Sequence, residues 1–521
     1  MKPPCSLLAH AGTQAGEKPR RLESYRRSDG REGPDRDTVQ LSEAKAVLRR
    51  TERGAALKLE PAAIPSPAQP ALARVLSTAD GFAIVTGSVI GSGIFLVPGT
   101  IATHLHSLRW VLCAWIAGGL LSLFGALSLA EFGSMLPAAG GLYVYLREAY
   151  GNAVAFLYGW GLITAIQSGS IATLAAGFAL YLGQLAGFSP LQSRAVAALT
   201  VLALTAFNLM SLNHAKILQQ LGNVAKLGGI AALGGLLFWR GHAATLGANW
   251  TNHGGANPSA GEPMGVFAFG ISIVAVLWAF EGWHLVSFTA GEFRSPQRDM
   301  PRSLIAGTAA VAAIYLMLNV AYYAVLGPNE IPGIPSAAAG AVEHAYGPAV
   351  TQFVSFLILT SIVVAINGNV VTGPRVYYAM AQDGLFFRAL GKTSRSGVPA
   401  IAIVVQGVWA AILSMIGSFE QLFTCVVFTA WIFYGLAVGG VLVVRRRDPD
   451  RPRAFRAPGY PLVPLLFVVA AAAVACSAIL SQPGHALIGA IAILTGLPVY
   501  LFFRARLGRT VPQIPAVESE S

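Results

Sequence analysis

A short stretch of the chain, Gly91-Ser-Gly93, places small and polar residues inside the apolar run from Asp80 to Thr103. The run is long enough to cross a bilayer, yet an uninterrupted helix would favour stronger helix formers at these positions. A spanning helix that breaks at mid-depth leaves backbone N–H and C=O groups without partners, which is tolerated only inside protein or beside a cavity. The free N–H groups that begin the second half-helix favour a carboxylate. We therefore interpret this stretch as a helix break that binds the anionic group of a ligand.

A second interruption strengthens this interpretation. Glycine is common in spanning helices, where it serves close packing, and with 57 glycines in 521 residues a Gly-x-Gly triplet also arises by chance. Much later in the chain, however, the apolar segment Val276–Leu285 contains an acid, a glycine and a histidine, namely Glu281, Gly282 and His284. Paired interruptions at corresponding positions of two halves are typical of a transporter's binding site. The two stretches together favour one shared site over helix packing.

The composition indicates that these stretches belong to a membrane protein. The chain is 54% hydrophobic and 12% charged, whereas about 25% of the residues in globular chains are charged. The net charge of +12 comes from basic residues between the apolar runs rather than on one folded face, which argues against a nucleic-acid partner. Twelve membrane spans are predicted, at roughly 80–103, 109–136, 153–186, 194–212, 217–239, 265–290, 303–327, 348–381, 398–416, 421–445, 462–482 and 485–504.

The loops between these spans differ sharply in charge. One side holds most of the basic residues, among them Arg147, Arg294, Arg298, Arg302 and Arg445-Arg446-Arg447, while the other has only Arg109, Arg194 and Arg240. The positive-inside rule therefore places both termini in the cytoplasm of a multi-pass protein of the plasma or inner membrane. Residues 1–74 lack the apolar core of a signal peptide and are predicted to be a disordered cytoplasmic tail. Residues 75–505 form the transporter domain, and 506–521 a second cytoplasmic tail.

Four motifs follow one another along the chain, namely Gly91-Ser-Gly-Ile-Phe-Leu-Val-Pro98, Glu131-Phe-Gly-Ser-Met-Leu-Pro-Ala-Ala-Gly-Gly-Leu-Tyr143, Glu292-Phe-Arg-Ser-Pro-Gln-Arg-Asp-Met-Pro301 and Asn367-Gly-Asn-Val-Val-Thr-Gly-Pro-Arg375. In sequence, order and spacing they resemble the amino acid–polyamine–organocation (APC) superfamily, especially its L-amino acid transporter branch and its stand-alone prokaryotic permeases. The resemblance covers about residues 75–480. It identifies a superfamily but does not name a substrate.

The resemblance implies an all-α integral membrane fold with twelve transmembrane helices and a 5+5 inverted repeat (LeuT/APC-like). The repeats would cover about 77–240 and 265–446, with discontinuous helices 1 and 6, and helices 11 and 12 would follow. It further implies a secondary active transporter that moves L-amino acids, of the neutral class, by sodium-independent exchange and alternating access. Three alternatives stay open: a proton-coupled amino acid symporter, a carrier of cationic amino acids or polyamines, and a non-transporting amino acid receptor.

Backbone groups at the two breaks are the predicted partners of an amino acid zwitterion. The N–H groups of the first break, with the Ser92 hydroxyl, can bind the carboxylate, and carbonyls freed at both breaks can accept from the ammonium group. The resemblance places the same backbone positions at the substrate. The predicted backbone site comprises Val89, Ile90, Gly91, Ser92, Gly93, Trp278 and Glu281.

Four side chains complete the predicted site. The resemblance makes Trp278 an aromatic gate over the substrate, and Phe280 is a second pocket candidate. Glu281 is a mid-membrane carboxylate that could bind a cationic side chain, carry a proton, or be satisfied by backbone amides. Lys226 lies too deep in the fifth span to snorkel easily. In similar transporters without sodium coupling, a lysine here occupies the place of a sodium ion and contacts the unwound first helix.

The remaining polar residues of the spans favour structural roles. Glu131, near a cytoplasmic end, can reach water or a loop arginine, and Asp80 lies three residues after Ser77 in a pattern typical of a capping box. His284 is expected to be hydrogen-bonded inside the bundle, and Arg375 to act as an orientation or gate charge.

The expected partners are an amino acid substrate and the lipid bilayer, in a monomer or homodimer. No catalytic cluster appears in the spans, so we expect neither an enzyme nor a cofactor or metal site. Some family members pair with a glycoprotein through a cysteine in the loop after the third span. Here that loop, Gly183–Pro190, contains no cysteine, so no disulfide-linked heavy chain is expected.

Overall fold

The structure is a computed structural model that describes residues 74–210, 212–252, 266–394 and 399–507. The predicted tails, 1–74 and 506–521, lie almost entirely outside the described residues. Within the described ranges the chain is helical, and its extended pairing is limited to one isolated bridge between Leu76 and Phe293.

The helices fall into two series separated by residues 253–265. The first series is α2 (Thr78–Val89), α3 (Gly93–His104), α4 (Leu108–Met135), α5 (Leu142–Tyr150), α6 (Asn152–Gly161), the π-helix η1 (Leu162–Ile166), α7 (Gln167–Ala186), α8 (Pro190–Met210), α9 (Leu212–Arg240) and α10 (Ala243–Thr251). The second is α11 (Val266–Ala279), the 3-10 helix η3 (Leu285–Glu292), α12 (Pro296–Val325), α13 (Ala337–Tyr346), α14 (Pro348–Thr372), α15 (Pro374–Gln382), the 3-10 helix η4 (Arg388–Gly391), α16 (Ala400–Ile416), α17 (Phe419–Arg447), α18 (Leu462–Ser481), α19 (Pro483–Leu494) and α20 (Gly496–Leu507).

Each predicted span coincides with a helix or a consecutive set of helices. In the described part of the chain, nine helices are long and apolar enough to cross a membrane, and ten if the bent pair α2–α3 counts as one span. The sixth and ninth predicted spans fall on the shorter apolar helices Ala268–Ala279 and Ala400–Ile416. The chain is therefore a multi-pass membrane protein by helix length and composition, while the count of twelve and the inverted repeat remain predictions.

Both predicted interruptions are present. The first apolar run divides into α2 and α3, whose axes differ by 43° at a break of three residues, Ile90 to Ser92. The second divides where α11 ends at Ala279, and a turn leads through Gly282 into η3. Gly282 has φ = +107°, a conformation that residues with a Cβ rarely adopt, which explains why an apolar helix stops there.

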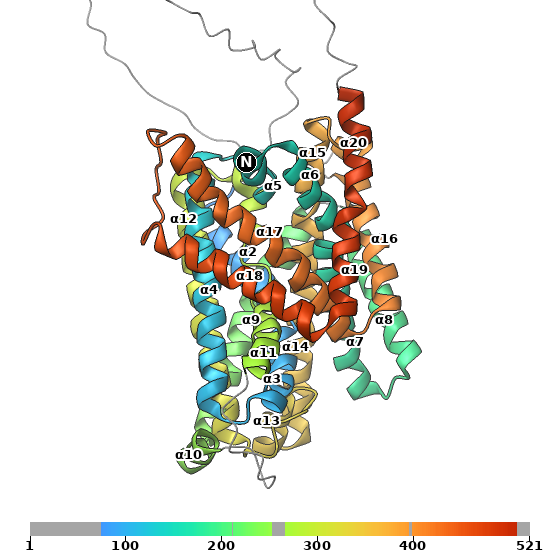
Figure 1. The fold of residues 1–521 in the computed structure, drawn as a ribbon. Coiled ribbons are helices and arrows are strands. Elements are labelled where there is room, and N and C mark those ends of the chain that lie inside the picture. Colours follow the sequence, from blue (N-terminus) through green and yellow to red (C-terminus); the bar gives the residue numbers. More distant parts are fainter. Residues whose placement is uncertain (1–73, 211, 253–265, 395–398, 508–521) are drawn as a thin grey trace, which may run out of the picture. The chain divides into compact units, whose positions relative to one another are not determined.

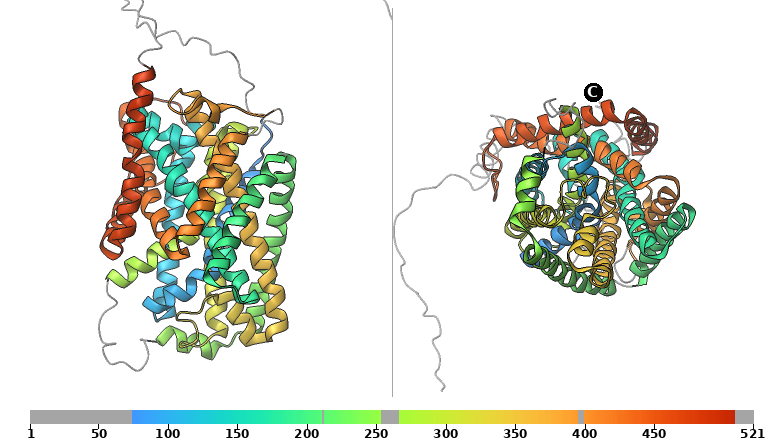
Figure 2. Two further views of the ribbon diagram at one scale, coloured as in Figure 1. Left: turned by 90° about the vertical axis from the view of Figure 1, so that its right-hand side faces the viewer. Right: turned by 90° about the horizontal axis from the view of Figure 1, so that it is seen from below.

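The two broken segments lie inside the bundle. α2 packs against α9, α12 and α14, while α3 packs against α11. α3 points toward the end that carries α10 and α13, and α5 and α15 lie at the opposite end (Figure 1). α18 and the helices that follow it lie along one outer edge (Figure 2). The breaks are thus shielded from the surroundings by other helices, as unpaired backbone groups require.

Short helices outside the spans were not predicted from the sequence. α5, α10 and α13 are nine or ten residues long and lie in the connections between the long helices. The start of α2 carries the expected capping box, in which the Ser77 hydroxyl accepts from the Asp80 N–H and the Asp80 carboxylate accepts from the Ser77 N–H.

Candidate functional site

The two helix breaks lie against each other because glycine lets their backbones approach. A Cβ added to Gly93 would lie 2.6 Å from the Cα of Ala279, the last residue of α11. A Cβ added to Gly282 would lie 3.3 Å from the carbonyl group of Ser88. The glycines predicted to interrupt the helices therefore also allow the two interruptions to form one site.

A tyrosine that the sequence analysis missed joins the breaks. The hydroxyl of Tyr315, on α12, lies 3.0 Å from the carbonyl oxygen of Val89 and 2.9 Å from that of Ala279. These two carbonyls belong to the last residues of α2 and α11, where the helical hydrogen-bond pattern ends. The Tyr315 side chain is fully buried, so its hydroxyl needs partners inside the protein. Its partners are the two carbonyl oxygens that the breaks leave without helical hydrogen bonds.

Lys226 caps the end of α2. Its ammonium group donates to the carbonyl oxygens of Gly87, at 2.7 Å, and Ile90, at 2.5 Å. A cation is favourable at this position because the last carbonyls of a helix lack partners and form the negative end of the helix dipole. The Ser361 hydroxyl, on α14, donates to the same Ile90 oxygen at 3.3 Å. The contact with the first break that the resemblance implied for Lys226 is present in the structure.

The breaks enclose a small cavity. Six of the predicted residues line it, namely Val89, Gly91, Ser92, Gly93, Trp278 and Glu281. Its volume is about 10 Å³, close to the space of one water molecule and far below that of an amino acid. The Ser92 hydroxyl on its wall is buried and has no hydrogen-bond partner in the part of the chain that the structure describes. In this conformation the cavity is therefore too small for an amino acid.

Two predicted residues lie outside the cavity wall. Ile90 uses its carbonyl oxygen to accept from Lys226 and Ser361, so that oxygen already has two donors. The Phe280 ring packs behind the break, with its centroid 6.1 Å from Trp115 and 5.1 Å from Tyr315. In this closed conformation Phe280 belongs to the packing that supports the break rather than to the pocket.

Trp278 covers the cavity together with aromatic side chains of α17. Its ring is stacked on Phe423 at a centroid distance of 6.2 Å and meets Phe419 edge-on at 6.4 Å. The indole N–H is buried and has no partner among the described residues. The Trp278 ring therefore belongs to a three-ring cluster with two residues of α17.

Glu281 also lines the cavity. One of its carboxylate oxygens accepts from the Tyr434 hydroxyl at 2.5 Å, and His284 Nε2 lies 3.2 Å from the same hydroxyl. The backbone N–H of Gly282 also interacts with the carboxylate, and the second carboxylate oxygen is buried without a side-chain donor among the described residues. His284 is hydrogen-bonded within the bundle, as expected from the sequence.

A vestibule whose wall includes several polar and charged side chains adjoins the cavity. This vestibule has a volume of about 440 Å³ and lies among α2, α9, η3, α14 and α15. Ser88 lines both the vestibule and the small cavity, so the two spaces adjoin at this residue. Arg375 lies on the vestibule wall and forms two hydrogen bonds with the Glu292 carboxylate, at 2.5 and 3.1 Å.

A larger cavity has no relation to the breaks. It measures about 760 Å³, and its walls are almost wholly apolar side chains of α7, α8, α9 and α14, such as Phe178, Phe207 and Phe356. An amino acid zwitterion would find few hydrogen-bond partners there. The small cavity, with its polar lining, is the better candidate despite its size.

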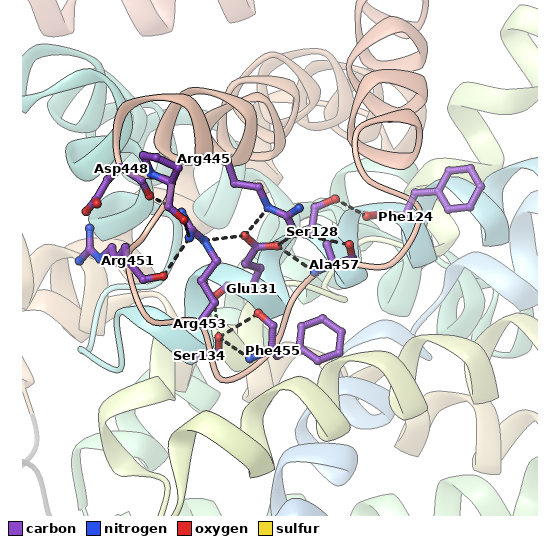
Figure 3. Close-up of polar contacts among 11 residues, drawn as sticks. Phe124, Ser128, Glu131, Ser134, Arg445, Asp448, Arg451, Arg453, Phe455 and Ala457 are labelled. Atoms are coloured by element: carbon purple, nitrogen blue, oxygen red, sulfur yellow. Dashed lines mark hydrogen bonds and ion pairs between the residues drawn. The ribbon is translucent and has the colours of Figure 1, made fainter.

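Glu131 has the structural role expected for it. Figure 3 shows its carboxylate facing Arg445 of α17 and Arg453 of the loop that follows α17. The Arg445 guanidinium donates twice, at 2.7 and 2.5 Å, and the backbone N–H of Ala457 donates at 2.8 Å. Arg453 Nε lies 3.2 Å from the same carboxylate. This fully buried carboxylate joins α4 to the connection between α17 and α18. Its role is therefore structural.

Comparisons with known proteins agree with this geometry. The sequence model of a family described as amino acid permease matches residues 76–503. The chain is 31% identical over 427 residues to the serine/threonine exchanger SteT of Bacillus subtilis, covering 81% of this chain and 95% of SteT. It is 29% identical to the human b(0,+)-type amino acid transporter 1, covering 84% of this chain and 89% of that protein. It is 26% identical to the human cystine/glutamate transporter, covering 83% and 85% of the two chains.

Proposed function

This chain belongs to the amino acid permease family, and we propose that it is a membrane transporter that exchanges L-amino acids by alternating access. The observation that carries the proposal is the junction of two helix breaks around a closed, polar-lined cavity. Paired breaks at the middle of a bundle are how transporters expose backbone groups to a substrate. Relatives along most of the chain are named as amino acid transporters or exchangers, which supports a transporter rather than an enzyme.

The substrate's backbone would bind to the breaks. Gly91, Ser92 and Gly93 line the cavity, and the N–H groups at the start of α3 together with the Ser92 hydroxyl suit a carboxylate. The ammonium group would approach the carbonyls of Val89 and Ala279, which the Tyr315 hydroxyl contacts in the closed cavity. Binding requires the cavity to expand, and the cluster of Trp278, Phe419 and Phe423 is the lid that would move.

Lys226 favours sodium independence. Its ammonium group places a positive charge against the carbonyls that end α2, a position that also favours a bound cation. We therefore propose that no sodium ion takes part in the cycle. Exchange of neutral amino acids is favoured by the similarity to a serine/threonine exchanger.

The arrangement of the chain in the membrane is proposed from the predicted spans, the family resemblance and the charge of the loops. We propose twelve spans with a 5+5 inverted repeat, both termini in the cytoplasm, and a location in the plasma or inner membrane. The vestibule beside Arg375 then faces the cytoplasm, and the bundle that contains the two breaks rocks against the remaining helices. We further propose that the chain works without a disulfide-linked heavy chain, as a monomer or homodimer.

Counterflow in proteoliposomes tests the proposal. Vesicles that contain the purified protein and unlabelled serine are expected to accumulate labelled serine faster than empty vesicles, with equal rates in sodium and in choline buffer. Faster uptake into empty vesicles under an inward proton gradient would favour a proton-coupled symporter instead. Specific binding of serine without any flux would favour a receptor.

A further inference from the structure

The wall of the vestibule carries three polar side-chain atoms that lack a hydrogen-bond partner among the residues that the structure describes, namely Ser88 Oγ, Gln219 Nε2 and Asn223 Oδ1. Ser88 is 3% exposed and Asn223 is 4% exposed. Buried polar groups normally have a hydrogen-bond partner, so three such atoms on one wall point to a ligand of the vestibule. At about 440 Å³, the vestibule has room for an amino acid.

The three atoms lie close together because two glycines leave space beside them. A Cβ added to Gly87, on α2, would lie 2.2 Å from Asn223 Oδ1 and 2.6 Å from Gln219 Nε2. A Cβ added to Gly368, on α14, would lie 2.9 Å from Ser88 Oγ and 3.4 Å from Gln219 Nε2. The Gln219 amide is therefore close to both of the other groups. We call these three side chains the vestibule cluster.

A chain of amides determines which atom of Gln219 is left for a ligand. On α8, Asn208 Nδ2 donates to the backbone carbonyl of Leu204 at 2.7 Å and to Asn367 Oδ1 at 2.9 Å. On α14, Asn367 Nδ2 donates to Gln219 Oε1 at 3.0 Å. Because a backbone carbonyl can only accept, it sets the orientation of the three amides in turn. The group that remains at the end of the chain is the NH₂ donor of Gln219.

The other two members of the vestibule cluster complement this donor. Asn223 Nδ2 donates to the backbone carbonyl of Ala83 at 2.8 Å, so its Oδ1 atom remains as an acceptor. The Ser88 hydroxyl can donate or accept. An amino acid zwitterion needs donors for its carboxylate and an acceptor for its ammonium group. The cluster offers both within a small space.

The charged side chains on the described wall of the vestibule are engaged with protein groups. Arg375 pairs with the Glu292 carboxylate, and the Asp80 carboxylate accepts from the N–H and the hydroxyl of Ser77. Recognition of a substrate therefore falls to uncharged side chains. Hydrogen bonds of this kind are weaker than those between charged groups. A substrate bound by the vestibule cluster can thus leave it easily.

We propose that the vestibule cluster is a second binding site for the amino acid substrate, which occupies it between the solution and the small cavity. The inference rests on the proposed exchange and adds a site to it. The substrate carboxylate accepts from Gln219 and Ser88, and the ammonium group donates to Asn223. Ser88 also lines the small cavity, so it contacts the substrate on both sides of this step.

A substitution of Gln219 tests the site through the two faces of the membrane. Gln219→Glu keeps the shape of the side chain and an oxygen for Asn367, but it replaces the NH₂ donor with an oxygen that repels a carboxylate. Serine uptake is measured in cells and in inside-out vesicles from the same cells. The KM for serine is expected to rise about tenfold or more on the face that the vestibule opens to, and to stay unchanged on the other.

Gln220→Glu is the matched control. It places the same charge on the adjacent residue, which is exposed and also lines the vestibule, and should change KM by about twofold or less. A rise of equal size in this control would assign the effect to charge alone and overturn the inference. A change of KM on both faces in Gln219→Glu would place its effect on the small cavity or on the conformational equilibrium, with the same consequence. Unchanged KM values would mean that the cluster binds only water.

A photolabel tests the site in the wild type and does not depend on the folding of a variant. A neutral L-amino acid with a diazirine in its side chain is irradiated with the full-length protein, and the adducts are mapped by mass spectrometry. We expect adducts within residues 219–223 that excess serine removes, because no described residue of α9 lines the small cavity. Adducts confined to the small cavity would overturn the second site and leave the proposed function intact. Absence of serine exchange in the wild type would instead reject the proposed function.

Discussion

The ammonium group of Lys226 lies 2.5 Å from the carbonyl oxygen of Ile90, the residue that directly follows the first half-helix. A side chain of α9 thus completes the hydrogen bonding of α2, across 136 residues of sequence. This relationship makes the shape of the first break depend on a charge carried by another helix.

Removal of that charge should weaken transport more than it weakens folding. Lys226→Ala leaves the Gly87 and Ile90 oxygens without their charged donor, a loss of about 1.5–3 kcal/mol for a charge-assisted hydrogen bond. We expect serine exchange in proteoliposomes to fall at least tenfold while membrane insertion persists. Lys392→Ala, at an exposed position, is the matched control. Normal uptake by purified Lys226→Ala would refute this role.

The first break should not tolerate a large side chain. The Ser92 side chain is fully buried on the wall of a cavity of about 10 Å³. Ser92→Leu would fill the space that the substrate carboxylate needs and remove the hydroxyl donor. We expect the binding of serine, measured by isothermal calorimetry on detergent-purified protein, to disappear. Undiminished affinity in this variant would show that the carboxylate binds elsewhere.

The hydroxyl of Tyr315 should matter to both stability and transport. Tyr315→Phe leaves the buried carbonyls of Val89 and Ala279 without this donor, which costs about 1–3 kcal/mol. We expect a lower melting temperature in detergent and slower exchange. Tyr322→Phe lies two turns further along α12 and removes a buried hydroxyl that has no described partner. An equal effect of the two variants would mean that the loss comes from packing and not from the bridge.

Two carboxylates at the basic end of the bundle should differ in their effect on stability. Glu131 is fully buried between Arg445 and Arg453, so Glu131→Gln leaves buried charge uncompensated and should cost about 3–5 kcal/mol. Glu148 is about one-third exposed where it pairs with Arg447 and Arg451, so Glu148→Gln should cost about 1 kcal/mol or less. Thermal unfolding of both variants in the same detergent provides the comparison. Similar melting temperatures would contradict this ranking.

The sequence predicted the features that depend on local chemistry. A glycine-flanked serine and an acid beside a glycine cannot continue an apolar helix without cost, so both breaks could be located before the structure was known. Lys226 could be found because a lysine deep in a span is expensive wherever the span lies. The long spans followed from hydropathy alone.

Features that depend on tertiary contacts could not be predicted from the sequence. Tyr315 lies in an ordinary apolar span, and only the packing of α12 against α2 brings its hydroxyl to the two breaks. The same limit explains Phe280, whose residue type suits a pocket but whose ring turns toward α4. The tyrosine partner of Glu281, Tyr434, lies 153 residues away in the chain and gives no local signal.

The Tyr315 hydroxyl brings one hydrogen atom to two oxygen atoms, those of Val89 and Ala279. At any instant one of these oxygens lacks that hydrogen, in a space with room for little more than one water molecule. A substrate ammonium group carries three hydrogens and supplies what the tyrosine alone does not. A loaded carrier is therefore better satisfied than a vacant one, and the vacant form should change conformation more slowly. Exchange would then be obligatory because the vacant site has fewer hydrogen-bond donors than its carbonyl oxygens can accept from.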